Sequence, residues 1–171
     1  MHVRSAWSHA PVLSAAPRAW PAWASMALGG SAFALADLAF ASLYWFLYAG
    51  VPPVRIGQGI ASWVVGSHAA HAGGVDAAIA GALLYCATVA AMVAGYMRLT
   101  TRWPQLHRHA WIAGSAYGMA MYGLLFEVIV PYFSAATART SSAPLSWTIA
   151  CLATFAGIGI GCAVIARAHA R

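Results

Sequence analysis

The sequence predicts an all-α membrane protein: a bundle of four transmembrane helices, with a short amphipathic helix between the first and second spans. Of the 171 residues, 62% are hydrophobic and only 7% are charged, whereas a soluble domain has roughly a quarter charged residues. The mean hydropathy is +0.72. The apolar residues form four runs that are long enough to cross a bilayer. No alternating strand pattern occurs, so helices are expected to satisfy the backbone in lipid.

The first span is predicted over residues 20–48, after a tail at residues 1–19 that shows no periodicity. At about 1.5 Å per residue this run exceeds a hydrocarbon core of roughly 30 Å. A cleavable signal peptide is the alternative interpretation, but its apolar region would be only about 7–15 residues long. The length of the run and the aromatic residues at both of its ends favour an uncleaved span.

The segment after the first span is too short and too rich in glycine to cross the bilayer. Its apolar residues recur at helical spacing, and its polar residues fall on the opposite side. An interfacial or re-entrant amphipathic helix is therefore predicted over residues 54–67. Its apolar side holds Ile56, Ile60, Trp63 and Val64, and its polar side holds Arg55, Gln58 and Ser62.

Three further apolar runs predict the remaining spans, over residues 76–97, 110–132 and 145–166. A basic loop joins the second span to the third, and residues 167–171 form a short tail. We expect one transmembrane domain over residues 20–166.

The arginines predict the orientation. All nine basic residues are arginine, which together with the many alanines indicates a GC-rich bacterial genome. With four spans, the two termini and the central loop share one side of the membrane, and arginine concentrates on the cytoplasmic side of inner-membrane proteins. Both termini are therefore predicted to be cytoplasmic. That side holds Arg4, Arg18, Arg98, Arg102, Arg108, Arg167 and Arg171, and the other side holds Arg55 and Arg139.

Each span has a face of small residues at three- and four-residue spacing. Helices in lipid associate through close packing of such faces, because hydrophobicity does not draw them together there. We expect the glycines of these faces to allow close backbone contact rather than to bind a ligand. They are Gly30 in the first span, Gly81 and Gly95 in the second, Gly123 in the third, and Gly157 and Gly161 in the fourth.

Two carboxyl groups lie within the predicted spans, Asp37 near the middle of the first and Glu127 toward the outer end of the third. A charge in hydrocarbon costs a few kcal/mol, so such residues usually face the bundle interior, pair, or bind a proton. Both are expected to face inward. Asp37 is either a proton or cation site or a structural lock bonded to a Tyr or Ser of a neighbouring span. We expect it to be protonated at neutral pH and to donate a hydrogen bond across the bundle. Glu127 has the same two interpretations, with hydration or pairing to Arg55 or Arg139 as the structural one.

His68, His71 and Asp76 form the single metal-like constellation. Imidazoles one turn apart can share a cation, and a nearby carboxylate can complete three ligands. The competing interpretation is two hydrated interfacial histidines. No histidine lies in the middle of a span, so a haem is not expected, and no cofactor is predicted.

The central loop from Arg98 to His109 is expected to contact anionic lipid headgroups. Its arginines lie between apolar runs instead of on a polar folded surface, which is not the pattern of a nucleic-acid-binding protein. The expected partners are the bilayer, anionic headgroups, and a second copy or another membrane protein.

The middle of the chain resembles a group of small, uncharacterised bacterial four-helix inner-membrane proteins. The similar pieces are IGQGIASWVVGSHAAHAGG, GYMRLTTRWPQL and GSAYGMAMYGLLFEVIVPYF, within roughly residues 50–133. The resemblance implies four spans and a short glycine-rich helix between the first two. It implies no activity, cofactor or site.

Two classes of function remain open. The sequence lacks a serine nucleophile elbow, a Cys-His pair and a phosphate-binding loop, so an enzyme is not expected. The first class is a non-enzymatic accessory or scaffold protein. The second is a small proton-linked conduit, in which Asp37 titrates and Tyr44, Glu127 and Arg55 lead outward. A cavity reaching Asp37 would favour the conduit, and an Asp37 sealed by hydrogen-bonding side chains would favour the scaffold.

Overall fold

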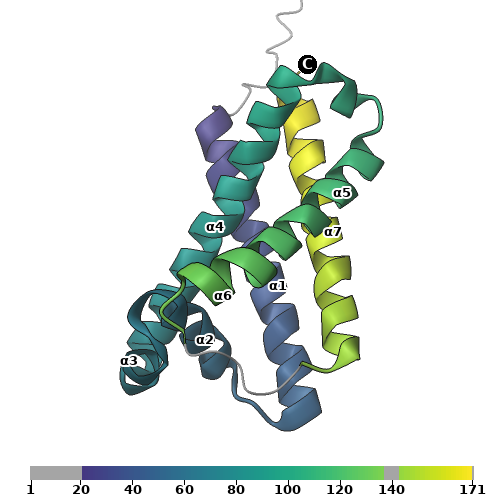
Figure 1. Ribbon diagram of the computed structural model, residues 1–171. Coiled ribbons are helices and arrows are strands. Elements are labelled where there is room, and N and C mark those ends of the chain that lie inside the picture. The colour runs from purple at the N-terminus through teal and green to yellow at the C-terminus, as the bar shows by residue number, and fades with distance from the viewer. Residues whose placement is uncertain (1–20, 137–142, 171) are drawn as a thin grey trace, which may run out of the picture.

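The computed structural model describes residues 21–136 and 143–170, and no strand occurs in these two stretches. Four helical segments are long and apolar enough to cross a membrane. The predicted all-α fold with four candidate spans is thus confirmed (Figure 1). The spans are α1 (Ala22–Ala49), α4 (Gly74–Arg102), α7 (Leu145–His169), and a third span that is made of α5 (Ala110–Gly123), a π-helical turn η2 (Leu124–Ile129) and α6 (Val130–Phe133).

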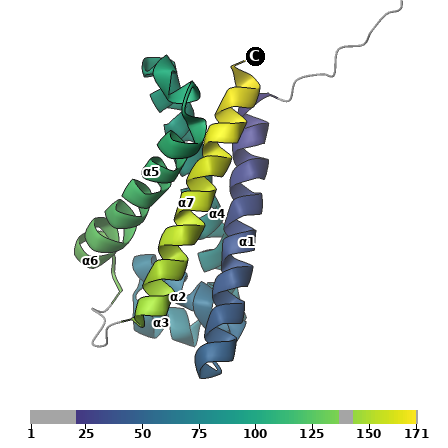
Figure 2. The same cartoon turned by 90° about the vertical axis from the view of Figure 1, so that its right-hand side faces the viewer.

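The four spans alternate in direction. The start of α1, the connection from α4 to α5, and the end of α7 lie at one end of the bundle (Figure 1). Figure 2 shows α7 and α1 side by side along most of their length, whereas α5 crosses α7 obliquely. The termini of the described chain therefore share an end with the central loop, as a four-span arrangement requires.

Two short helices, α2 (Pro53–Val65) and α3 (Ser67–Ala72), occupy the opposite end. The sequence predicted one helix over residues 54–67. Gly66 divides it, because this residue has φ 81° and ψ 159°, a conformation that is essentially restricted to glycine.

Close backbone contacts hold α4 against its neighbours. A Cβ atom at Gly30 of α1 would lie 2.6 Å from the Cα atom of Ala90, and one at Gly81 would collide with the carbonyl oxygen of Gly57 in α2. Real Cβ atoms do not tolerate such distances, so only glycine allows these helices to approach so closely. The expected packing roles of Gly30 and Gly81 agree with this geometry.

The contact between α5 and α7 uses glycines that the sequence analysis did not select. A Cβ at Gly118 would collide with the carbonyl oxygen of Phe155, and Gly159 lies against Gly114 and Gly118. Small residues occur on more than one side of α5, so their spacing alone did not identify the contacting side.

Gly123 and Gly157, by contrast, were expected at helix contacts and require correction. No heavy atom lies within 4 Å of the Cβ position at either glycine. Within one copy of the chain, both face open space. Gly95 and Gly161 instead make room for aromatic side chains, those of Tyr117 and Phe33.

The third span contains a π-helical turn that sequence patterning did not predict. The N–H of Val130 donates to the carbonyl of Leu125, five residues earlier. Pro131 has no N–H, and in a regular α-helix its ring would clash with the carbonyl of Glu127. The wider turn immediately before the proline is where the helix accommodates it.

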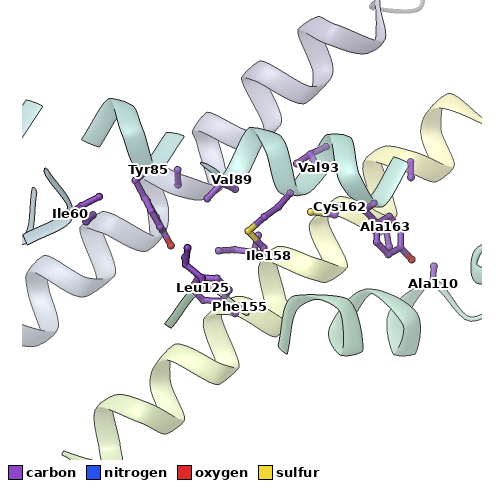
Figure 3. Close-up of a cluster of buried hydrophobic side chains, with 14 residues drawn as sticks. Ile60, Tyr85, Val89, Val93, Ala110, Leu125, Phe155, Ile158, Cys162 and Ala163 are labelled. Carbon is purple, nitrogen blue, oxygen red and sulfur yellow. The ribbon is translucent and has the colours of Figure 1, made fainter. Parts of the chain in front are cut away.

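The apolar core lies where α4 faces α7. Tyr85, Val89 and Val93 extend from α4, and Phe155 and Ile158 extend from α7 (Figure 3). The core therefore lies in the middle of the bundle. Tyr85, one of its residues, is also the partner of Asp37 on α1.

We predict opposite effects for two glycine-to-alanine changes. Gly118→Ala places a methyl group on the Phe155 carbonyl and forces the backbones apart, which lowers the free energy of unfolding by about 1–3 kcal/mol. Gly157→Ala meets open space and gains helix propensity, so stability is unchanged or rises by up to about 1 kcal/mol. Thermal unfolding in detergent measures both. Equal losses in the two variants would contradict the assigned contact.

Candidate functional site

The candidate site is a hydrogen bond between two spans. The hydroxyl of Tyr85 on α4 donates to Oδ2 of Asp37 on α1. Tyr85 is 3% exposed and Asp37 is half-buried. On α1, Ala34 and Ala41 are buried on either side of the aspartate along the same face. The pair thus joins two helices inside the bundle, as the structural-lock interpretation of Asp37 expects, but Asp37 accepts the hydrogen bond where the sequence analysis expected it to donate one.

The helix packing explains why these two side chains meet. Two turns from Asp37, the contact between Gly30 and Ala90 brings the backbones of α1 and α4 together. Aspartate is short, so its carboxylate can only bond to a side chain on a helix that lies this close. The longer tyrosine spans the remaining gap. Small residues along α1 are therefore a precondition for the bond.

Thiol groups also lie near this pair. Cys86 of α4 and Cys151 of α7 are close enough to the Tyr85 hydroxyl to interact with it electrostatically. Asp37 and Tyr85 therefore lie in an environment that contains weakly polar groups from two spans, α4 and α7. A thiol is a weak hydrogen-bonding group, so these cysteines add little to the solvation of the carboxyl group.

A groove of about 290 Å³ runs between α1, α2 and α4. Leu38 and Ser42 form its wall on α1, and Asp37 is not among its lining residues. The walls are almost entirely apolar, with Ser42 as the polar exception. This groove therefore does not give the carboxyl group of Asp37 a polar route.

Tyr44 lies two helical turns beyond Asp37 and makes a different contact. Its hydroxyl is 2.7 Å from Oγ of Ser146, and its ring centroid is 4.9 Å from that of Trp147. The residue joins the end of α1 to the start of α7. It does not lead toward Asp37.

Arg55 is exposed on α2, and its Nη1 atom donates to Oε1 of Gln58 over 3.4 Å. The two sides predicted for this helix require correction: Ser62 of the polar side is buried, and Val64 of the apolar side is 65% exposed. Gln58 of the polar side is buried as well, and its Nε2 atom donates to the carbonyl of Gly74 over 2.8 Å, which ties α2 to the start of α4. A periodic pattern separates polar from apolar sides but does not show that a second helix covers the polar side.

Glu127 also departs from expectation. The sequence placed it on an inward face, but the residue is exposed in the π-helical turn. The residues that pack inward are one or two positions away, at Leu125 and Phe126. No ion pair joins Glu127 to Arg55 in the described chain, and Arg139 lies outside the described residues.

The proposed metal ligands do not converge. His68 and His71 are exposed on α3, and Asp76 is exposed in the first turn of α4. No three His, Cys, Asp or Glu side chains gather closely enough to hold a metal ion among residues 21–136 and 143–170. The chain turns at Gly73 and Gly74 between the two helices, so the regular helical spacing that the prediction assumed does not continue from the histidines to Asp76.

A second buried tyrosine on α4 differs from Tyr85, because its hydroxyl has no acceptor such as Asp37 among the described residues. Tyr96 is 1% exposed, and its hydroxyl has no hydrogen-bond partner in the described structure. Its ring packs edge-on against Tyr117, with 5.1 Å between centroids. The hydroxyl of Tyr117 instead donates to the carbonyl of Met92 over 2.8 Å. No sequence signal distinguished the bonded tyrosine from the unbonded one.

Comparison with known proteins adds no relative: no protein-family model, no curated protein and no solved structure matches this chain. The class therefore follows from the fold alone. Four apolar helices of spanning length fit a multi-pass membrane protein, and hydrogen bonds from Tyr85 and Tyr117 join neighbouring spans.

We predict that the two buried tyrosines respond differently to loss of the hydroxyl. Tyr85→Phe removes the donor to Asp37 and lowers the free energy of unfolding by about 1 kcal/mol. Tyr96→Phe removes an unpartnered buried hydroxyl, so stability stays the same or rises. Thermal unfolding of the two variants in the same detergent provides the comparison, and a larger loss for Tyr96→Phe would refute the assignment.

Proposed function

We propose that this protein is a non-enzymatic accessory or scaffold component of the bacterial inner membrane. The observation that best supports the proposal is the bond from Tyr85 to Asp37. A buried carboxyl group that accepts a hydrogen bond from the next helix stabilises one arrangement of the bundle. Asp37 thus has a structural use that needs no substrate and no moving proton.

The positions of the other polar residues support the same proposal. A conduit would need Tyr44, Arg55 and Glu127 to form a path from Asp37 to the surface. Tyr44 instead contacts Ser146, Arg55 contacts Gln58, and Glu127 is exposed on the outer side of the third span. These groups are on separate parts of the molecule.

A scaffold needs surfaces for association, and the outer faces of α5 and α7 are suitable ones. Gly123 and Gly157 have open space where other glycines of this chain contact a neighbouring backbone. We propose a second copy or another membrane protein as the partner of these faces. In lipid, small residues let helices approach closely enough for strong dispersion contacts.

The orientation completes the proposal. The end of the bundle that holds the central loop and the end of α7 is the arginine-rich end, and we place it in the cytoplasm on the basis of the positive-inside rule. The helices α2 and α3 then lie at the periplasmic surface.

Proton flux tests the scaffold against the conduit. We expect purified protein in liposomes to give the same flux as protein-free liposomes under an imposed pH gradient. Asp37→Asn should fold normally and leave this baseline unchanged, because the amide keeps an oxygen that can accept from Tyr85. A flux above baseline that disappears in Asp37→Asn would overturn the scaffold proposal and support the conduit.

Cysteine labelling tests the orientation. Gln105 and Ala135 are exposed at opposite ends of the bundle. In intact cells, a membrane-impermeant thiol reagent should label Ala135→Cys but not Gln105→Cys. The unsubstituted protein is the control for its three native cysteines, which lie within the spans. Labelling of Gln105→Cys alone would reverse the orientation.

A further inference from the structure

We propose that the arginine-rich end of the bundle is a binding surface for the headgroups of anionic phospholipids. We define the basic end as Arg98, Arg102, Arg108 and Arg167. This surface is separate from the Asp37–Tyr85 pair and does not depend on the scaffold role.

Three segments of the chain build the basic end. Arg98 and Arg102 lie one turn apart in the last turns of α4, and Arg108 follows the short helix η1 (Pro104–His107). Arg167 is in the last turn of α7. Figure 1 shows the end of α4, the connection through η1 and the end of α7 at the same end of the molecule. All four side chains are exposed.

These charges have no acidic side chain to neutralise them. The chain has three acidic residues. Asp37 is in the middle of α1, Asp76 is in the first turn of α4, and Glu127 is in the π-helical turn beyond α5. All three are far along the helices from the basic end. No hydrogen bond from a guanidinium group of the basic end occurs in the part of the chain that the structure describes. No acidic side chain of the chain is therefore placed to neutralise the basic end, which leaves it open to an anion from outside the protein.

Two tryptophans place the basic end at the level of the lipid headgroups. Trp103 follows α4 directly and is 57% exposed, and Trp111 is in the first turn of α5 and is 66% exposed. Exposed tryptophans concentrate at the membrane interface, where one side of the ring is apolar and the other is wet. Arg102 and Arg108, which lie close to these tryptophans in the sequence, are then expected at the depth of lipid phosphates.

Arginine is suited to this ligand. Its planar guanidinium group can donate two parallel hydrogen bonds to phosphate oxygens, and it keeps its charge at any physiological pH. The positive-inside rule accounts for the sign of the charge on this end of the bundle. The positive-inside rule does not by itself require these arginines to be exposed at interfacial depth away from acidic side chains. This exposure is what attracts an anionic headgroup.

Lipid binding by the purified protein tests the proposal. The protein in a neutral detergent is titrated with phosphatidylglycerol or with phosphatidylcholine of the same acyl chains, and bound lipid is counted by native mass spectrometry. We expect phosphatidylglycerol to bind more tightly. Arg102→Gln and Arg108→Gln should each weaken its binding by about fivefold, since an interfacial arginine contributes about 1 kcal/mol of attraction.

Arg55→Gln is the matched control, because Arg55 is also exposed but lies on α2 at the other end of the bundle. It should leave phosphatidylglycerol binding unchanged. Circular dichroism confirms that each variant is folded. Equal binding of the two lipids, or an equal loss in Arg55→Gln, would overturn the proposal. Displacement of the lipid by sodium phosphate, but not by sodium chloride at the same ionic strength, would instead identify a site for free phosphate and would also overturn it.

Discussion

The close approach of helix backbones at glycine is the constraint on which the rest of this structure depends. In lipid, an apolar side chain gains nothing by leaving hydrocarbon for a neighbouring helix, so short-range dispersion contacts must hold the spans together. Gly30, Gly57 and Gly81 bring α1 and α2 onto α4, and Gly118 with Gly159 brings α5 onto α7. At each of these glycines, an added methyl group would collide with the backbone of the neighbouring helix.

The polar interior follows from this packing. The carboxyl group of Asp37 reaches the hydroxyl of Tyr85 because small residues on α1 allow α4 to approach. Gln58 reaches the carbonyl of Gly74 where α2 lies against the start of α4 through Gly57. A buried polar group in lipid is costly unless it is bonded. Close packing and polar pairing thus depend on each other. Close packing brings the polar groups within bonding distance, and the hydrogen bonds favour one alignment of the packed helices.

The two ends of the bundle differ in chemistry. At one end, arginines and tryptophans are exposed on helix ends and on the connection between α4 and α5, with no acidic side chain among the described residues there. At the other, two short helices fold back over the spans, and the chain contacts itself through Gln58 and through the bond from Ala135 N–H to the carbonyl of Trp63. The first end thus exposes its basic side chains, whereas hydrogen bonds between separate segments of the chain hold the second end together.

The sequence by itself was enough to predict a membrane environment, an all-helical fold and the positions of the four spans. Run length and charge are properties of each segment alone and do not depend on its neighbours. It also identified Asp37 as a residue that needs a partner, since a carboxyl group in hydrocarbon is costly anywhere. Only the tertiary structure decided that Tyr85 rather than Tyr96 is that partner, that Gly118 rather than Gly123 meets a neighbouring helix, and that Glu127 faces outward. Small residues lie on more than one side of these helices, so the side that is buried depends on how a helix is rotated against the others, and this rotation is set by contacts between segments distant in the sequence.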